Sequence, residues 1–355
     1  MTETRAILDA AVAALGGQAR DGQRQMAQAI DDTVAAGGRL LVQAGTGTGK
    51  SLAYLAPAAA HLVAHPSSRV VVATATLALQ TQLATKDIPL IVDATAQATG
   101  HEVAWTLLKG RSNYACLLKV RDQAREDDQA ELLEAGAVAT ALKSSRADAL
   151  AVLGAEVVAL RRWAEEEAEA EGAGDRDDAP SHSAKAWAQV STTSHECLGA
   201  QRCPHTKDCF AELARERARR SDLVVTNHAL VAVDAELDTG ALPDHDLVVL
   251  DEAHELSARV TGAATKELSP QMVDRVAQRA AKWLKEETAD ALRRAANHLR
   301  GALEAAGPGR VVDSAGQVAE ACREVAGAGR DALSELAGDK SEPERTQAAL
   351  ALDEV

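Results

Sequence analysis

The chain has 355 residues, which allows two or three domains and a sizeable core, and only 2% of the residues are aromatic, so the core must consist of Ala, Leu and Val. The formal net charge is −15, but residues 120–178 hold 16 acidic against 7 basic side chains and supply most of it, so net charge does not exclude a nucleic-acid partner. The five cysteines, an odd number, argue against a disulfide framework. Without a leader or a long apolar run, we expect a soluble, cytoplasmic protein with no membrane partner.

The first segments predict helices. Residues 4–16 form one, ended by Gly16 and Gly17, and residues 20–36 form the next. Gln23, at the start of the second helix, could read adenine because its amide group both donates and accepts hydrogen bonds. A solvated helix face is the plainer explanation, and only the loop that follows favours adenine.

Residues 40–51 predict a phosphate-binding loop, which is the strongest local signal in the chain. An apolar run over 40–42 predicts a strand, and spaced glycines then let backbone N–H groups surround phosphate oxygens. A helix-compatible continuation over 51–64 disfavours the alternative, a Gly-rich turn with a surface lysine. Lys50 would reach the β- and γ-phosphates of ATP, and Ser51 would bind Mg²⁺. The expected nucleotide contacts are Ala44, Gly45, Thr46, Gly47, Thr48, Gly49, Lys50 and Ser51.

Residues 69–76 predict a second buried parallel strand, followed by a helix over 77–84. Polar side chains there and after residue 107 could contact a nucleic-acid backbone, although each signal is weak. They are Thr74, Thr76, Gln80, Gln82, Lys109, Arg111, Asn113 and Tyr114. The low-complexity acidic stretch 165–178 predicts a mobile, solvated insertion without chemistry.

Four cysteines have a spacing that indicates ligation. Cys116, Cys197, Cys203 and Cys209 form a C-x80-C-x5-C-x5-C pattern, and the last three fall within thirteen residues. Zinc ribbons favour C-x2-C knuckles, which are absent, whereas four thiolates on wider loops suit a [4Fe–4S] cluster. Zinc and unligated thiols remain the alternatives. The nearby His195 and His205 are expected to be structural or solvent-facing.

A strand over 222–227 ends in a polar turn, and a buried parallel strand over 247–250 runs into Asp251, Glu252 and, two residues later, His254. Asp251 would hold the Mg²⁺ shell while Glu252 polarises the attacking water. The chemistry requires such an acidic pair at the carboxyl end of a strand. This D-E-A-H sequence would be unremarkable alone, but about 200 residues after the phosphate loop it is strong evidence.

The rest of the chain predicts helices only. Ser269 and Pro270 begin one that runs to about residue 285, and others are expected over 287–304, 314–326 and 330–336 and from Ser341 onward. Cys322 lies in one of these helices, where packing is its expected role.

Residues 20–260 resemble the N-terminal half of DinG/XPD-type helicases, the iron–sulfur branch of superfamily 2. The resemblance rests on R-D-G-Q-R-Q-M, A-G-T-G-T-G-K-S, T-A-T-L-A-L-Q-T-Q-L, K-G-R-S-N-Y-A-C, the clustered cysteines, V-V-T-N-H-A-L and D-E-A-H. K-G-R-S-N-Y-A-C together with V-V-T-N-H-A-L is similar to the bacterial DinG side of the family.

The resemblance implies an α/β fold: a RecA-like P-loop domain with a parallel sheet (residues 1–108 and 221–258), an inserted iron–sulfur cluster domain with the acidic insertion (109–220) and an incomplete helical arch (259–355). It implies an ATP-dependent DNA helicase of the DNA-repair type, moving 5′→3′ on single-stranded or forked DNA. Lys50, Asp251 and Glu252 would be catalytic, and Gln23 and His254 would contact the nucleotide. Cys116, Cys197, Cys203 and Cys209 would hold the [4Fe–4S] cluster.

The chain departs from the family in lacking a G-R-x-x-R motif, which in the family belongs to a second RecA-like lobe and supplies an arginine finger. Because a finger contributes roughly 10³–10⁵ in rate, we expect this chain to bind ATP but to hydrolyse it slowly and not to translocate. A missing C-terminal half or a partner would supply that lobe, and the chain reads as truncated. The alternative is a non-translocating, ATP- and DNA-binding iron–sulfur module. A P-loop small-molecule kinase is disfavoured by D-E-A-H and the four cysteines.

Overall fold

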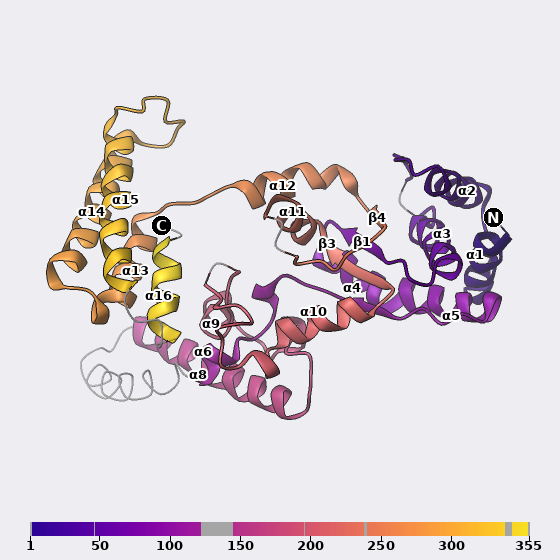
Figure 1. Ribbon diagram of the computed structural model, residues 1–355, viewed down its shortest axis with the longest axis horizontal. Helices are drawn as coiled ribbons and strands as arrows, with labels where there is room; N and C mark the ends of the chain where they lie inside the picture. The colour runs from indigo at the N-terminus through magenta and orange to yellow at the C-terminus, as the bar shows by residue number, and fades with distance from the viewer. Residues whose placement is uncertain are drawn as a thin grey trace. The chain divides into compact units, whose positions relative to one another are not determined.

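The computed structural model describes residues 2–45, 47–121, 145–194, 196–237, 240–337 and 343–353 (Figure 1). These residues form two compact units, and each unit is discontinuous in sequence. The first contains Met1–Gly110 and Ala211–Thr265, and the second contains Arg111–Phe210 and Lys266–Val355. None of the described helices is both long and apolar enough to cross a membrane.

A parallel four-stranded sheet forms the centre of the first unit, in the order β2-β3-β1-β4. Its strands are β1 (Val70–Thr74), β2 (Trp105–Leu107), β3 (Leu223–Asn227) and β4 (Leu247–Leu250). Val72 pairs with Val225 on one side and Val249 on the other. The carboxyl ends of these three strands therefore lie at the same edge, where open α/β sheets bind their ligands.

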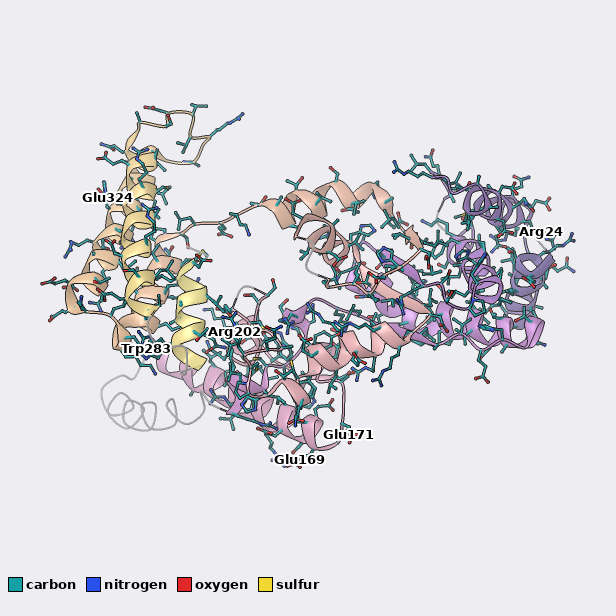
Figure 2. The ribbon with its side chains drawn as sticks, in the orientation of Figure 1. Arg24, Glu169, Glu171, Arg202, Trp283 and Glu324 are labelled. Atoms are coloured by element: carbon teal, nitrogen blue, oxygen red, sulfur yellow. The ribbon has the colours of Figure 1, made fainter. Side chains whose placement is uncertain are left out.

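Helices surround this sheet. They are α1 (Thr2–Ala14), α2 (Asp21–Ala35), α3 (Lys50–Ala64), α4 (Leu77–Gln82), the π-helical turn η1 (Leu83–Asp87), α5 (Ile88–Thr99), α10 (Phe210–Arg220), α11 (His228–Leu237), the short η5 (Ala253–Glu255) and α12 (Leu256–Ala264). Ala, Leu, Val and Ile dominate the core, which confirms the expectation from composition. Arg24 of α2 donates to Asp9 of α1 at 3.1 Å and joins these two helices (Figure 2).

The predicted helices 4–16, 20–36 and 51–64 and the predicted strand 69–76 are confirmed, with ends shifted by at most two residues. The strand predicted over residues 40–42 is wrong. This described segment is irregular, and Leu41 is 93% exposed. Three apolar residues after a Gly-Gly pair are too few to fix a strand without a hydrogen-bonded neighbour.

The strand predicted over 247–250 is confirmed in position and direction, but the expectation that it is buried is wrong. In the sheet order β4 is an edge strand, and Val248 is 39% exposed. An apolar run signals a strand but does not reveal how many neighbours it has.

The first part of the second unit carries α6 (Leu117–Arg121), α8 (Ser145–Glu169) and α9 (Ala184–Val190), with short η2 (Arg111–Asn113), η3 (Arg176–Asp178) and η4 (Thr206–Asp208). The prediction of a solvated insertion over 165–178 is wrong in part, because this stretch contains the end of α8 and buried residues as well as exposed acidic ones. The Arg121 guanidinium donates three hydrogen bonds to the Glu165 carboxylate, and Asp175 is 8% exposed and bridges to Tyr114. Gly174 at φ +59° is necessary there, because a Cβ would lie 2.3 Å from the Phe210 ring.

The last part of the second unit is helical, as predicted, with α13 (Pro270–Ala280), η6 (Ala281–Trp283), α14 (Glu286–Ala306), α15 (Gln317–Leu336) and α16 (Pro343–Asp353). Ser269 caps α13 by accepting from Met272 N at 3.3 Å. Glu324 of α15 contacts His298 Nδ1 of α14 at 2.6 Å (Figure 2).

One long helix, α15, replaces the two that were predicted over 314–326 and 330–336. Its buried face, Ala321, Val325, Ala332 and Leu336, continues across Gly327 and Gly329. Packing of that face outweighs the roughly 1 kcal/mol that each helical glycine costs.

Candidate functional site

The phosphate loop occupies the N-terminal end of α3. Gly47 (φ +74°) and Gly49 (φ +80°) are left-handed, and Gly49 is the N-cap of the helix. Thr48 Oγ1 donates to Gly45 O at 2.8 Å, which closes the turn. Thr46 lies outside the described residues. Left-handed glycines directly before a helix N-terminus place backbone N–H groups where an anion can bind, so this segment fits a nucleotide phosphate.

Gln23 is buried against this loop rather than on a solvated helix face. Its Oε1 accepts from Arg20 N at 2.9 Å, and its Nε2 donates to Gly49 O at 3.2 Å. Arg20 adds a bond from Nη1 to Gly47 O at 2.9 Å. Both atoms of the Gln23 amide group that could read adenine are therefore hydrogen-bonded within the protein, and the role in adenine recognition stays a prediction.

Lys50 forms an ion pair with Glu252, so the phosphate loop meets the acidic pair that follows β4. The hydrogen bond to Glu252 raises the pKa of Lys50, and the same bond lowers the pKa of Glu252. The side chains are only 21% and 29% exposed. A nucleotide phosphate would have to take the place of Glu252 beside the Lys50 ammonium group.

Asp251 extends the sheet by one residue, because its N–H donates to Ala73 O at 2.8 Å. Glu252 then turns into the left-handed region at φ +54°, an uncommon conformation for a residue other than glycine. This reversal directs the Glu252 side chain toward Lys50. His254 is 70% exposed, with its Nδ1 3.5 Å from Glu252 Oε2.

Two buried residues, Tyr54 and His228, and the partly buried Asp87 lie beside this site and were not singled out as functional from the sequence. Tyr54 is 3% exposed and lies beside Ser51 and Asp251, and burial is the main cause that raises its pKa. Burial also raises the pKa of Asp87, against the smaller lowering effects of Ser51 and Gln82. His228 is fully buried near the backbone of Asp251, and burial lowers its pKa. For His228 the V-V-T-N-H sequence was an available signal, whereas Tyr54 and Asp87 lie in ordinary helical sequence.

The residues suggested as nucleic-acid contacts are mostly engaged within the fold. Gln80 is 1% exposed and donates to Leu108 O at 3.4 Å, so its predicted role as a DNA contact is wrong. Outside that set, α10 carries the basic residues Arg219 and Arg220, which lie 3.3 and 2.8 Å from Glu216. That pairing offsets the positive charge on this helix.

The four predicted cluster ligands, Cys116, Cys197, Cys203 and Cys209, are partly buried residues of the second unit and form no disulfide bond. Burial raises the pKa of Cys116 to about 11, and the nearby Cys197 and Cys209 raise it further. Gly199 N donates to Cys197 Sγ at 3.4 Å, as backbone groups do around iron–sulfur centres. Within the part of the chain that the structure describes, which omits His195, no three His, Cys, Asp or Glu side chains are placed to hold a metal ion.

Comparison with known proteins agrees with this geometry. Residues 20–112 match the DEAD/DEAH box helicase family. The chain is 42% identical over 312 residues to the ATP-dependent helicase DinG of Mycobacterium tuberculosis, covering 86% of this chain and 44% of that protein. The chain is a relative of the DinG helicases.

Two further relatives have different names. The DinG-like chain is 36% identical over 247 residues to the ATP-dependent DNA helicase YoaA of Escherichia coli, covering 68% of this chain and 34% of that protein. It is 30% identical over 243 residues to the 3′–5′ exonuclease DinG of Bacillus subtilis, covering 67% and 23% respectively. The DinG-like chain thus spans less than half the length of each of these relatives.

Proposed function

We propose that this chain is the nucleotide-binding part of a DinG/XPD-type DNA helicase, which couples ATP hydrolysis to 5′→3′ movement on single-stranded or forked DNA. The observation that supports this best is the contact of Lys50 with Glu252, which joins the phosphate loop to the acidic pair across 202 residues. Relatives named ATP-dependent helicases support the same reaction.

The residues around the loop fit ATP with Mg²⁺, because the site combines backbone N–H donors, a lysine, a hydroxyl and a carboxylate. Lys50 and the N–H groups before α3 would bind the β- and γ-phosphates. Ser51 and Asp251 would hold Mg²⁺, which neutralises phosphate charge when bound. Ala44, Gly45, Thr46, Gly47, Thr48 and Gly49 would line the phosphates, and Gln23 and His254 would lie at the nucleotide.

Glu252 would orient the attacking water and accept its proton, since its carboxylate lies beside Lys50, which is expected to bind the terminal phosphate. The contact with Lys50 lowers the pKa of Glu252 until a phosphate takes its place. Lys50, Asp251 and Glu252 are thus the proposed catalytic residues.

For the rest of the chain we propose the organisation implied by the resemblance: a motor domain (1–108 and 221–258), a cluster domain (109–220) and a helical arch (259–355). Cys116, Cys197, Cys203 and Cys209 would hold a [4Fe–4S] cluster. The proximity of Cys197 and Cys209 to Cys116 supports this donor set.

A second candidate is a non-translocating ATP- and DNA-binding module. The coverage of 44% of the Mycobacterium tuberculosis relative favours it, because an activity of the whole relative need not belong to this part. A lobe outside these residues, on the same or another chain, would supply the arginine finger, since these residues contain no G-R-x-x-R motif.

The deciding experiment is ATP hydrolysis by anaerobically purified protein, with and without single-stranded DNA. We expect ATP binding with slow turnover, and binding should be lost in Lys50→Ala but kept in the surface control Lys86→Ala. Turnover stimulated by DNA would establish motor activity in the chain itself. ATP binding without stimulation supports the second candidate, and wild-type ATP affinity in Lys50→Ala would refute the phosphate-loop assignment.

A further inference from the structure

A π-helical turn places an additional carboxylate beside the phosphate loop. Helix α4 continues through η1 into α5, and Pro89 is the second residue after the π turn. Proline lacks an N–H group and its ring collides with the carbonyl group four residues earlier, so the helix has to widen at this point. Asp87 is the last residue of the widened turn, and its side chain lies beside Ser51 and Gln82.

Tyr54 brings a hydroxyl group to the same place from α3. It lies three residues after Ser51, so both side chains occupy one face of the helix. Its ring is 97% buried, and its hydroxyl group lies beside Ser51 and Asp251. The hydroxyl oxygen is buried without a hydrogen bond of ordinary length to any described residue.

The Asp87 carboxylate has spare acceptor capacity as well. Its Oδ2 atom is buried, and none of the described groups donates a hydrogen bond to it. Leaving a buried carboxylate oxygen and a buried hydroxyl unpaired is costly. Both groups lie beside Ser51, and each also interacts with Asp251. Two polar groups with unfilled hydrogen-bonding capacity, the Asp87 carboxylate and the Tyr54 hydroxyl, thus lie next to the residues expected to contact Mg²⁺.

We propose that Asp87 and Tyr54 are positioning residues for the divalent cation that accompanies the nucleotide. Asp87 accepts the Ser51 hydroxyl proton in a hydrogen bond, which leaves a lone pair of Ser51 Oγ free for the metal. Tyr54 donates its proton to Asp251 and fixes the orientation of that carboxylate. Groups that bond to metal ligands in this way orient them, and their loss typically costs about 10- to 100-fold in metal affinity or activity. The inference rests on the proposed ATP site.

A purely structural role for the pair predicts something different. If Asp87 and Tyr54 only supported the fold, their replacement would lower stability and would weaken nucleotide binding equally with and without metal. If they orient metal ligands, only the part of the affinity that depends on metal would change.

The test measures the affinity for mant-ATP in Mg²⁺ and in EDTA for the full chain and for Asp87→Asn and Tyr54→Phe. The control is Asp93→Asn, which removes an exposed carboxylate from α5. We expect both test variants to bind about 10-fold more weakly in Mg²⁺ and normally in EDTA, and the control to match wild type. Replacing Mg²⁺ with Mn²⁺ should restore part of the loss, because Mn²⁺ binds the same ligands more tightly.

Equal weakening in Mg²⁺ and EDTA, or wild-type behaviour of both variants, would overturn the inference and leave the proposed function intact. Absence of any Mg²⁺-dependent gain in the wild-type chain would instead refute the proposed function. Tyr54→Phe removes one unpaired oxygen atom and keeps the packing, so it decides the question if Asp87→Asn does not fold.

Discussion

Lys50 and Glu252 form an ion pair although 202 residues separate them in the chain. The pair links the start of α3 to the turn after β4, and it occupies both side chains that the proposed reaction needs. Nucleotide binding must therefore separate the two groups before either can act on a phosphate.

Glu252→Gln is expected to separate binding from hydrolysis. Loss of the base should lower ATP turnover by about 10²–10⁴-fold. Affinity for Mg²⁺-ATP should rise by up to about fivefold, which corresponds to the ~1 kcal/mol of a partly exposed ion pair that no longer competes for Lys50. Turnover and binding titrations measure both effects, with the nearby Glu255→Gln as control. Wild-type turnover in Glu252→Gln would contradict the assigned role.

Gln23→Ala is expected to weaken binding of ATP, GTP and inorganic triphosphate alike, by about tenfold. The side chain makes two hydrogen bonds to the loop and helix start, at 2.9 and 3.2 Å, each contributing about 1 kcal/mol. The matched control is Gln28→Ala, whose side chain bonds within α2 to Asp32. A loss confined to ATP would show that adenine recognition is the main role of Gln23.

The variants Gly47→Ala and Gly49→Ala distinguish the energetic cost of a strained backbone from the cost of a steric clash with a neighbouring side chain. Both positions have positive φ, so each alanine should cost about 1–2 kcal/mol of unfolding free energy. At Gly49 the new Cβ would lie 2.1 Å from Gln23 Nε2, whereas no described atom is within 4 Å at Gly47. Denaturant unfolding should show the larger loss for Gly49→Ala, together with weaker ATP binding. A larger loss for Gly47→Ala would contradict the described contact.

Cys203→Ser is expected to lose bound iron, and Cys322→Ser should keep it. Cys203 belongs to the predicted four-thiolate set, and Cys322 packs against the core of the helical part in α15. Iron and sulfide content per chain, measured after anaerobic purification, tests this directly. A full iron complement in Cys203→Ser would refute the four-cysteine cluster.

Local patterns were sufficient to predict most elements of the fold. The apolar strand 69–76, the capped helix beginning at Ser269 and the Gly-ended helix 4–16 each carry their own signals, and all are confirmed. The segment 40–42 and the edge position of β4 were not predictable this way, because both depend on which strands become neighbours. Continuation of α15 through two glycines likewise depends on packing.

The residues of the candidate site could likewise be predicted only in part from the sequence. Lys50, Ser51, Asp251 and Glu252 could be named from spacing, since phosphate and metal chemistry fixes their residue types. Asp87 and Tyr54 could not, because an aspartate before Ile-Pro and a tyrosine in an apolar helix are ordinary until the fold brings them beside Ser51. The hydrogen bonds that the Gln23 amide group makes within the protein could not be predicted from the sequence either.

The left-handed backbone conformation of Glu252 lowers the stability of the fold at a residue that the proposed reaction needs. A non-glycine residue at φ +54° costs about 1–2 kcal/mol, and glycine or asparagine would relieve much of it. Neither could serve as the proposed base, so selection for thermostable variants would favour substitutions at residue 252 that abolish the proposed hydrolysis. Libraries built to stabilise this chain should hold residue 252 fixed.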